Sequence, residues 1–516
     1  MADIVLKNRE GQDVPYEGVN VLRVYTPEGN TELYHNGEIV TATVEPDFSE
    51  GNIVVDAGEG KFYSEVTIKK PENLRPEVIL KDENVAGIVG TLEPSSGGED
   101  GGGGGAVAVS PSDINFYDYD GTIVAAWTLE ELAAATALPD NPEHDGLISQ
   151  GWNWTLEELK ATNRAMDVGQ MYITDDGKTR LYIKFTNSDR MDITLCFSQT
   201  VANGVTIDWG DGSATENKDS TGYLKLSHTY ENCGEYVITL DPADECTLGL
   251  GSGSTNYNVL NAGIAADSSN KIYCYYLKKV EIGKNLPTIG TAAFYLCSGL
   301  ELITIPRSVT QFGEKFIITN TRAAAIIVPI GVTEIPTYFA ASASHAKCIS
   351  FPFGVTAVGA SAVSGASAIR CIRIPNGVTE IPERLCNPAA SIEDIFIHEG
   401  VKTVGPNAFS CGMAQRVVIS QGVTTIGTYG FTSCGEKTTR ITVPDSVESI
   451  GDSAFYNCNG VKQFHFKRNS PPTLGKNVFS GISSDCIIYV PKGRLSSYKN
   501  ATNWSAYASY MQEEAE

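Results

Sequence analysis

The sequence lacks the features that would place a chain in a membrane or around a metal ion. No apolar run reaches ~18 residues, so we expect no membrane-spanning helix. Residues 1–10 are charged and contain no apolar core, so we expect no secretory signal. Cysteine is missing from the first 195 residues, and the 12 cysteines beyond them show no CxxC or mixed His/Cys spacing of a zinc site. The sequence therefore predicts neither membrane insertion nor a metal site.

Catalytic motifs are also scarce. The tripeptide Gly177-Lys178-Thr179 has Tyr172 where a P-loop needs glycine, and no GxSxG, HExxH or strand-associated GxGxxG motif occurs. Glu334 and Glu380 recur at one repeat position, which favours an exposed ladder of carboxylates. A glycosidase pair has no sequence signature, so a polysaccharide-degrading tailspike stays an alternative. We expect no enzymatic activity and no cofactor.

Charge is distributed unevenly along the 516 residues. The formal net charge is −24, made up of −12 over residues 1–105, −17 over residues 106–270 and +5 over residues 271–516. The acidic part should repel nucleic acid and anionic membranes, so we expect no nucleic-acid partner. The basic part can accept an acidic partner.

Glycine marks the clearest boundary. Residues 94–106 include five consecutive glycines, which predict a flexible linker. Before it, β-branched segments in residues 1–93 predict a small β module. Residues 71–92 resemble a segment of bacteriophage tail-associated proteins at Asn73, Leu74, Pro76, Ile79, Gly87, Gly90 and Thr91. That resemblance implies docking to other virion proteins, and a generic β module is the alternative.

Residues 107–168 form a second predicted module. A strand runs into an Asp-Gly turn at Gly121, and an amphipathic helix is expected over residues 156–165. The segment resembles the β-grasp repeat of listerial and gut-bacterial surface proteins at Pro139, Pro142, Gly146, Gly151 and Trp152, which implies a spacer. Trp152 and Trp154 could stack on sugar rings, but packing in a core is the simpler expectation.

Residues 169–250 resemble a polycystic-kidney-disease type β-sandwich. The motif WGDG at 209–212, SHTY at 227–230 and GEYVITL at 234–240 occur in the family order. The resemblance predicts a second spacer in which Trp209 fills the sandwich. For Asp208, Asp211 and His228 we expect structural use in turns, with a calcium site as the alternative.

A repeat of about 23 residues dominates the chain from residue 271 onward. Its anchor aliphatics are Leu286, Val309, Val332, Val355, Val378, Val401, Val423 and Val447. Another apolar residue follows each anchor by three positions, and Gly or Pro comes next. One such turn cannot bury its own apolar side, so stacked turns must share a continuous core. The pattern I-P-x-x-V-T-x-I-G-x-x-A-F-x-x-C resembles the BspA-like leucine-rich repeat of bacterial and protozoan surface proteins, which implies adhesion to proteins or glycans.

Two further features belong to this array. Cys297, Cys411, Cys434 and Cys458 share one repeat position and are expected to be buried thiols, with disulfides as the alternative. The segment Ile487–Val490 with Pro491, Tyr498 and Trp504 resembles the family's C-terminal cap.

These observations predict a mainly β, multidomain chain with small N-terminal β modules, a β-sandwich and a C-terminal leucine-rich-repeat solenoid. The predicted parts are a virion-docking module (1–93), a linker (94–106), a β-grasp-like module (107–168), a β-sandwich (169–250) and the solenoid with its cap (271–516). We expect a bacteriophage virion structural protein, a fibre or appendage, that displays the solenoid to a host-surface glycan or protein. The alternative is an adhesin on a bacterial cell surface. The sequence leaves open whether the chain forms a homo-oligomer.

A candidate receptor-binding column follows from the repeat. The sixth residue after each anchor lies just outside the inward apolar positions, so we expect it to face solvent. Large side chains at this position are the receptor-binding candidates, because tyrosine and cationic residues are favoured at binding hot spots and beside sugars. They are Lys315, Tyr338, Arg384 and Tyr429, and the remaining members of the column are Ala292, Ser361, Asn407 and Ser453. An ordinary solvated face is the alternative.

Overall fold

The computed structural model divides the chain into two compact units, residues 1–106 and 107–516. It describes residues 113–186, 191–251, 258–260, 275–318, 321–387, 392–410, 413–435 and 437–515, together with the backbone of seven short strands before residue 90. The described structure is mainly β, which confirms the predicted fold class. None of the described helices is long and apolar enough to cross a membrane.

The first unit contains three small antiparallel groups of strands. They are β2 (Val21–Thr26), β3 (Gly29–His35) and β4 (Glu38–Ile39); β1 (Val5–Lys7) with β5 (Glu65–Thr67); and β6 (Asn84–Val85) with β7 (Ile88–Val89). The residues that carry the phage-like resemblance, the glycine linker and the expected docking role lie outside the described residues.

The second unit begins with a mixed four-stranded sheet in the order β10-β11-β8-β9. Its elements are β8 (Ile114–Tyr117), β9 (Ile123–Trp127), α1 (Leu129–Ala134), β10 (Leu147–Trp152), α2 (Leu156–Thr162) and β11 (Met166–Thr174). Thr128 and Thr155 start the two helices with capping boxes. Each hydroxyl accepts a hydrogen bond from the backbone amide of the glutamate three residues later, and the carboxylate of that glutamate accepts one from the backbone amide of the threonine. Trp152 and Trp154 are buried and donate to the carbonyl oxygens of Pro139 and Phe351. Neither ring is available to stack on a sugar.

A β-sandwich follows. One sheet holds β14 (Val205–Asp208), β16 (Gly234–Pro242) and β12 (Thr179–Phe185), and the other holds β15 (Gly222–Thr229), β13 (Asp192–Gln199) and β17 (Leu248–Leu250). Trp209 is fully buried between them, and its indole nitrogen donates to Glu216 over 2.8 Å. The sandwich forms where the WGDG motif predicts it, and its kinship with the polycystic-kidney-disease type stays a prediction.

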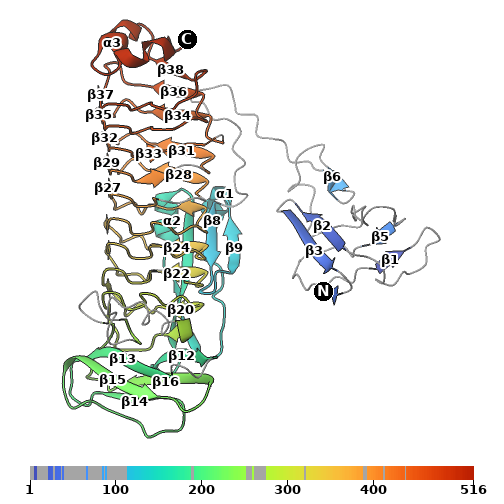
Figure 1. The fold of residues 1–516 in the computed structure, drawn as a ribbon, viewed down its shortest axis with the longest axis vertical. Coiled ribbons are helices and arrows are strands. Elements are labelled where there is room, and N and C mark those ends of the chain that lie inside the picture. Colours follow the sequence, from blue (N-terminus) through green and yellow to red (C-terminus); the bar gives the residue numbers. More distant parts are fainter. Residues whose placement is uncertain are drawn as a thin grey trace. The chain divides into compact units, whose positions relative to one another are not determined.

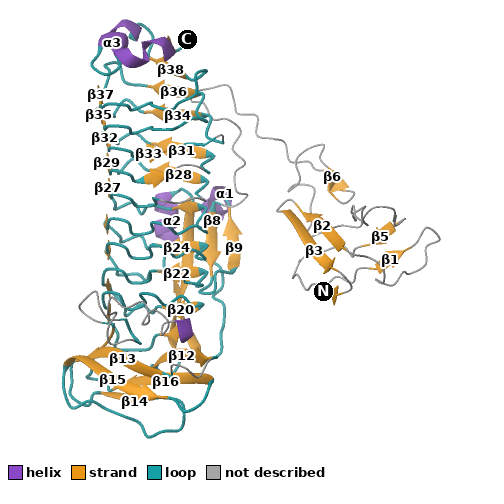
Figure 2. Cartoon of the chain, viewed as in Figure 1, coloured by secondary structure: helices purple, strands orange, loops and turns teal. Residues whose placement is uncertain are grey.

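The solenoid is built from two stacks of parallel strands. The longer strands form the strand face, defined as β18 (Leu277–Glu281), β20 (Leu302–Thr304), β22 (Ala325–Ile327), β24 (Cys348–Ser350), β26 (Cys371–Ile372), β28 (Asp394–Ile397), β31 (Arg416–Ile419), β34 (Arg440–Val443), β36 (Gln463–Phe466) and β38 (Ile487–Val490). Two-residue strands form the second stack: β19 (Thr288–Ile289), β21 (Gln311–Phe312), β23 (Glu334–Ile335), β25 (Ala357–Val358), β27 (Glu380–Ile381), β29 (Thr403–Val404), β32 (Thr425–Ile426), β35 (Ser449–Ile450) and β37 (Thr473–Leu474). A third, short ladder pairs β30 (Phe409–Ser410) with β33 (Phe431–Thr432). Figures 1 and 2 show the stacked turns and their short strands.

The predicted repeat positions fill the core between these stacks. All eight anchors, from Leu286 to Val447, are at most 1% exposed. Phe409, Phe431, Phe455 and Phe479 stack one above another with ring centroids 5.5–5.9 Å apart. Glycine after the second apolar residue lets neighbouring turns approach closely, since a Cβ on Gly451 would lie 2.6 Å from the amide nitrogen of Thr428. The apolar period therefore specifies the spacing of the turns.

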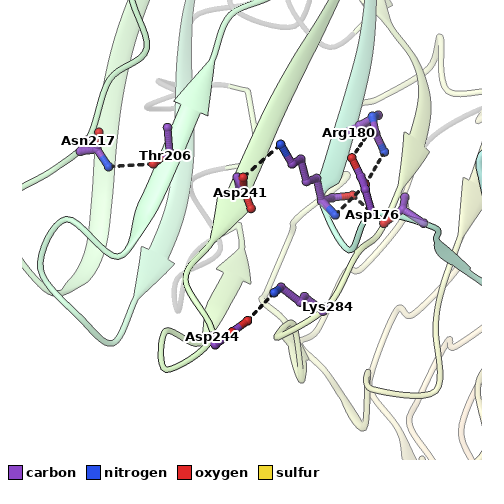
Figure 3. Close-up of polar contacts among 9 residues, drawn as sticks. Asp176, Arg180, Thr206, Asn217, Asp241, Asp244 and Lys284 are labelled. Atoms are coloured by element: carbon purple, nitrogen blue, oxygen red, sulfur yellow. Dashed lines mark hydrogen bonds and ion pairs between the residues drawn. The ribbon is translucent and has the colours of Figure 1, made fainter.

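Both ends of the solenoid core are closed by other structure. The sandwich continues into the first turns, because β12 pairs with β18 and β17 pairs with β19. Lys284 in the first turn reaches Asp244 of the sandwich, and Figure 3 shows this contact beside Arg180–Asp176. At the other end, α3 (Leu495–Asn500), the 3-10 helix η3 (Ser505–Tyr510) and β39 (Met511–Glu513) cover the last turn, with Tyr498 and Trp504 fully buried.

The four-stranded module packs directly on the strand face. β11 contacts β20, β22 and β24, and Figure 1 shows the module beside the middle turns. The buried amide of Asn153 donates to the carbonyl oxygen of Val328 over 2.9 Å and to the Ser350 hydroxyl over 3.0 Å, and it accepts from Gly169 over 2.8 Å. Arg164 donates to the carbonyl oxygen of Ile374. The module and the sandwich, expected as spacers, thus form one compact unit with the solenoid.

Candidate binding surfaces of the solenoid

The predicted receptor-binding column is a continuous ladder of left-handed backbone. Each of its eight members has φ between 52° and 58°. The amide of each member donates to the carbonyl of the residue at the fifth position of the next turn, as Tyr338 does to Ala360 and Tyr429 to Asp452. Non-glycine residues rarely adopt this conformation, and its cost is offset here by a hydrogen bond in every turn. The column is therefore a structural feature of the repeat as well as a candidate surface.

The side chains of the column differ in exposure. Tyr338 and Tyr429 are 40% and 38% exposed, Arg384 is exposed, and Lys315 is half-buried. The expectation that the whole column faces solvent is wrong for the small residues, because Ala292, Ser361 and Ser453 are buried. Their side chains end before they reach the surface, so only the longer residues project.

The projecting residues are evenly spaced. Tyr338, Arg384 and Tyr429 occupy alternate turns, with Ser361 and Asn407 in the turns between them. Hydrogen-bonded strands lie about 4.8 Å apart, so neighbouring projections are roughly 10 Å apart along the solenoid. Lys315 lies one turn before Tyr338. The structure brings the four predicted residues into one line.

Sequence reasoning missed one aromatic neighbour of this column. Tyr456 is 46% exposed, and its ring meets the Tyr429 ring edge to face with centroids 6.0 Å apart. It stands nine residues after the anchor Val447, a position that the repeat pattern does not restrict. The sequence could have indicated this residue, because a tyrosine stands there at a position that the repeat does not require to be apolar.

The strand face carries a second set of polar residues that the sequence analysis did not select. Outward positions alternate with buried ones along each strand, and those of adjacent strands are in register: Asp394, Arg416, Arg440 and Gln463. Arg416 donates to both carboxylate oxygens of Asp394 over 2.8 and 2.9 Å, and Arg373 adds a third bond over 3.1 Å. Burial opposes ionisation of Asp394, but the bonds from Arg416 outweigh it and lower the pKa of this carboxyl group.

The acidic and histidine residues of the sandwich have structural roles. Asp208 accepts from the amide of Gly210, and Asp211 accepts from Ser213 and lies 2.7 Å from His228. The His228 ring stacks on Trp209 with centroids 4.5 Å apart. Burial opposes ionisation of Asp211, but hydrogen bonds from Ser213 and His228 outweigh it and lower its pKa to about 2. These contacts match the expected use in turns.

Two other sequence candidates are placed by the structure. Glu334 and Glu380 are exposed on β23 and β27, which β25 separates, so they lie about two strand spacings, roughly 10 Å, apart. Cys297, Cys434 and Cys458 are buried thiols, as expected, and Cys411 lies outside the described residues. Among the described residues, no group of three or more His, Cys, Asp or Glu side chains is arranged to hold a metal ion.

Comparison with known proteins matches the solenoid to a family. Residues 269–387 and 380–501 match the profile described as "BspA type Leucine rich repeat region", in six copies. A comparison with curated proteins finds no match.

Several solved structures are similar to part of this chain. A leucine-rich repeat protein from Bacteroides ovatus is 22% identical over 46% of this chain and 66% of its own, with a TM-score of 0.36. One from Eubacterium ventriosum is 18% identical over 47% of this chain and 76% of its own, with a TM-score of 0.31. A leucine rich cell surface protein from Faecalibacterium prausnitzii is 21% identical over 38% and 61%, with a TM-score of 0.23. The family match agrees with the repeat geometry, so the C-terminal part of this chain is a BspA-type leucine-rich-repeat region.

Proposed function

We propose that this chain is a non-catalytic binding protein of a bacterial cell surface, and that its solenoid holds the binding surface. The observation that carries the proposal is the line of projecting residues Tyr338, Arg384 and Tyr429 on a rigid left-handed ladder. Aromatic and arginine side chains are the types that supply most binding energy at protein interfaces, and tyrosine rings also stack on sugars.

The BspA-type region supports the bacterial surface over the virion. This repeat resembles those of bacterial and protozoan surface proteins, and the matched region covers the whole solenoid. The virion role rests on residues 71–92, whose distinguishing positions lie outside the described residues. The surface adhesin, the alternative expected from the sequence, is therefore the function that we propose.

The ligand that suits the line of projections is an extended polymer. Projections about 10 Å apart, separated by small side chains, present equivalent contacts to a chain that repeats at a similar interval. Each contact alone is weak, but contacts made along one chain act together because the second binds at high effective concentration. A glycan or an extended protein segment meets this requirement.

The binding surface is tested by replacing the three projecting residues together. The variant Tyr338→Asn, Arg384→Asn and Tyr429→Asn keeps the left-handed backbone, because Asn407 and Asn477 occupy the same position naturally. Binding of the full chain to arrays of bacterial and animal glycans and matrix proteins is then measured. We expect the triple variant to lose about tenfold or more in affinity.

The control is Tyr223→Thr, which removes a tyrosine of similar exposure from β15 of the sandwich and should leave binding unchanged. Unchanged binding by a folded triple variant would exclude the column as the binding surface. Hydrolysis of any bound glycan by the purified chain would contradict the non-catalytic role. Location is tested with an antibody: labelling of intact producing cells supports the proposal, whereas recovery only in purified phage particles would restore the virion role.

A further inference from the structure

The strand face of the solenoid is only partly covered by the neighbouring module. β11 lies over β20, β22 and β24, where Gly169 approaches Ile327 so closely that an added Cβ would be 2.3 Å from its side chain. Figure 1 shows β31, β34 and β36 beyond the module, toward the C-terminal cap. On these strands the outward side chains reach the surface, and the Arg416 side chain is 38% exposed. We call β31, β34 and β36 the open strand face.

The two arginines on this face differ in how far nearby carboxylates balance their positive charge. Arg416 is bound to Asp394 through two hydrogen bonds, and Asp113 of the module adds a second negative charge nearby. Val418 pairs with Thr442, and this register extended by two residues places Arg440 beside Arg416. Within the part of the chain that the structure describes, Arg440 makes no ion pair and no side-chain hydrogen bond, and its buried Nε has no partner. The terminal nitrogens of this guanidinium therefore have no acceptor among the described residues.

Other donors without acceptors surround Arg440. Gln463, its register partner on β36, has its Oε1 3.2 Å from the Nε2 of His465, and its amide nitrogen has no protein partner among the described residues. The Thr442 hydroxyl, two residues along β34 on the same face, has no protein partner among the described residues. The nearby carboxylate of Glu514 is already bound by Lys467 over 2.8 and 2.9 Å and by His465 over 3.0 Å. The patch thus offers several donors and a positive charge.

A carboxylate complements this arrangement. A partly buried guanidinium with unpaired N–H groups loses solvation, and a carboxylate restores both the charge balance and the hydrogen bonds. Arg–carboxylate pairs are frequently bidentate, which fixes the orientation of the ligand. Gln463 and Thr442 can donate to other oxygens of the same ligand, since a carboxylate accepts several bonds.

We propose that the open strand face binds a carboxylate of an acidic glycan, with Arg440 as the central contact and Gln463 and Thr442 as supporting donors. One observation favours a glycan over an acidic protein. Protein interfaces usually centre on large apolar anchors, but β31, β34 and β36 carry no exposed large hydrophobic side chain. The segment 271–516 has a net charge of +5, which attracts a polyanion of either kind. The inference rests on the proposed binding function but uses a different face from the Tyr338–Tyr429 column.

The test compares two forms of one polymer. Polygalacturonate carries a carboxylate on every sugar, and its methyl ester removes the charge with little change in shape. Binding of the full chain to both forms is measured by calorimetry at several salt concentrations. We expect binding to polygalacturonate that weakens as salt rises, and at least tenfold weaker binding to the ester.

Variants at Arg440 identify the contact. Arg440→Gln should lose about tenfold in affinity for polygalacturonate, equivalent to about 1.4 kcal/mol, and Arg440→Lys should lose less because it keeps the charge. The matched control is Arg322→Gln, which removes one charge near β22, with four strands of the strand face between it and β34. Its affinity should stay within about twofold of the parent, well below the tenfold step.

Each result decides the proposal. Equal binding of the acid and ester forms, or equal binding by the parent and both Arg440 variants, overturns it. Tighter, Arg440-dependent binding of poly-glutamate would overturn the glycan and identify an acidic peptide as the ligand class. If polygalacturonate fails while array binding still depends on Tyr338, Arg384 and Tyr429, the proposed function stands and this inference falls. If the chain binds no ligand at all, the proposed function falls as well.

Discussion

The contact between the module and the solenoid includes one buried amide, and Asn153→Ala should loosen it. Asn153 is fully buried, and its side chain makes hydrogen bonds to Val328, Ser350 and Gly169. Alanine removes these bonds and leaves the backbone carbonyl of Val328 and the amide of Gly169 without their side-chain partner. Each hydrogen bond contributes about 1 kcal/mol and each unsatisfied buried group costs ~1–3 kcal/mol, so we expect a loss of about 2–4 kcal/mol.

Hydrogen exchange measures this loss where it occurs. The module can open from the strand face without unfolding the whole unit, and the amides of β11 and β24 report that opening. At 1.4 kcal/mol per factor of ten, a loss of 2–4 kcal/mol corresponds to exchange roughly 30-fold or more faster. The control is Asn217→Ala in the sandwich, whose amide bonds Thr206 at an exposed site over 3.1 Å (Figure 3). Exchange in β11 should not change in this control.

The reasoning fails if Asn153→Ala leaves exchange of β11 and β24 unchanged. A second variant, Asn153→Asp, sharpens the test because it keeps the shape and removes the donor. It places a carboxylate oxygen against the carbonyl of Val328, and an uncompensated buried charge costs more than a missing bond. Aspartate should therefore destabilise the contact more than alanine, and the opposite order would refute the assigned hydrogen bonds.

Three further predictions concern the solenoid. Phe455→Ala removes a fully buried ring from the phenylalanine stack and should lower the free energy of unfolding by about 3–5 kcal/mol, measured by urea denaturation, with an effect under 1 kcal/mol contradicting the shared core. Tyr429→Ile should reduce the melting temperature relative to Tyr429→Asn, because a β-branched side chain fits a φ of 54° poorly; equal melting temperatures would argue against the left-handed ladder. Burial and the charge of Arg164 lower the pKa of His398 to about 4 from the ordinary 6.5. The stability that neutral His398 contributes is therefore complete above pH 6.5 and lost as pH falls toward 4, so His398→Gln should flatten the pH dependence of urea midpoints in that window.

Much of the solenoid could be predicted because the repeat is local. The anchors from Leu286 to Val447 and the glycines that follow are specified by a pattern that recurs within each turn, and every anchor is buried as expected. The motif around Trp209 predicts a sandwich through its resemblance to the polycystic-kidney-disease type module, and Trp209 is buried between two sheets.

The candidate surfaces could be predicted only in part. Counting from the anchors found the column and its exposed members Tyr338, Arg384 and Tyr429. Counting could not show that every member is left-handed, since lysine, tyrosine and arginine do not favour that conformation. It also placed Ser361 and Ser453 at the surface, because a period gives the direction of a side chain but not how far its neighbours extend.

The sequence by itself determined the β class, the 23-residue period and the residues that fill the core, since each depends on apolar residues at fixed local spacing. Only the tertiary structure decided which strands stay open. Asn153 and Val328 are 175 positions apart in the chain, and their contact places the module over β20, β22 and β24. The module does not extend over β34. The carboxylate of Asp394 is already bound by Arg416 and Arg373. Among the described residues Arg440 is consequently left without a partner, because the pairing of charges depends on packing between distant segments and on competition for a single carboxylate.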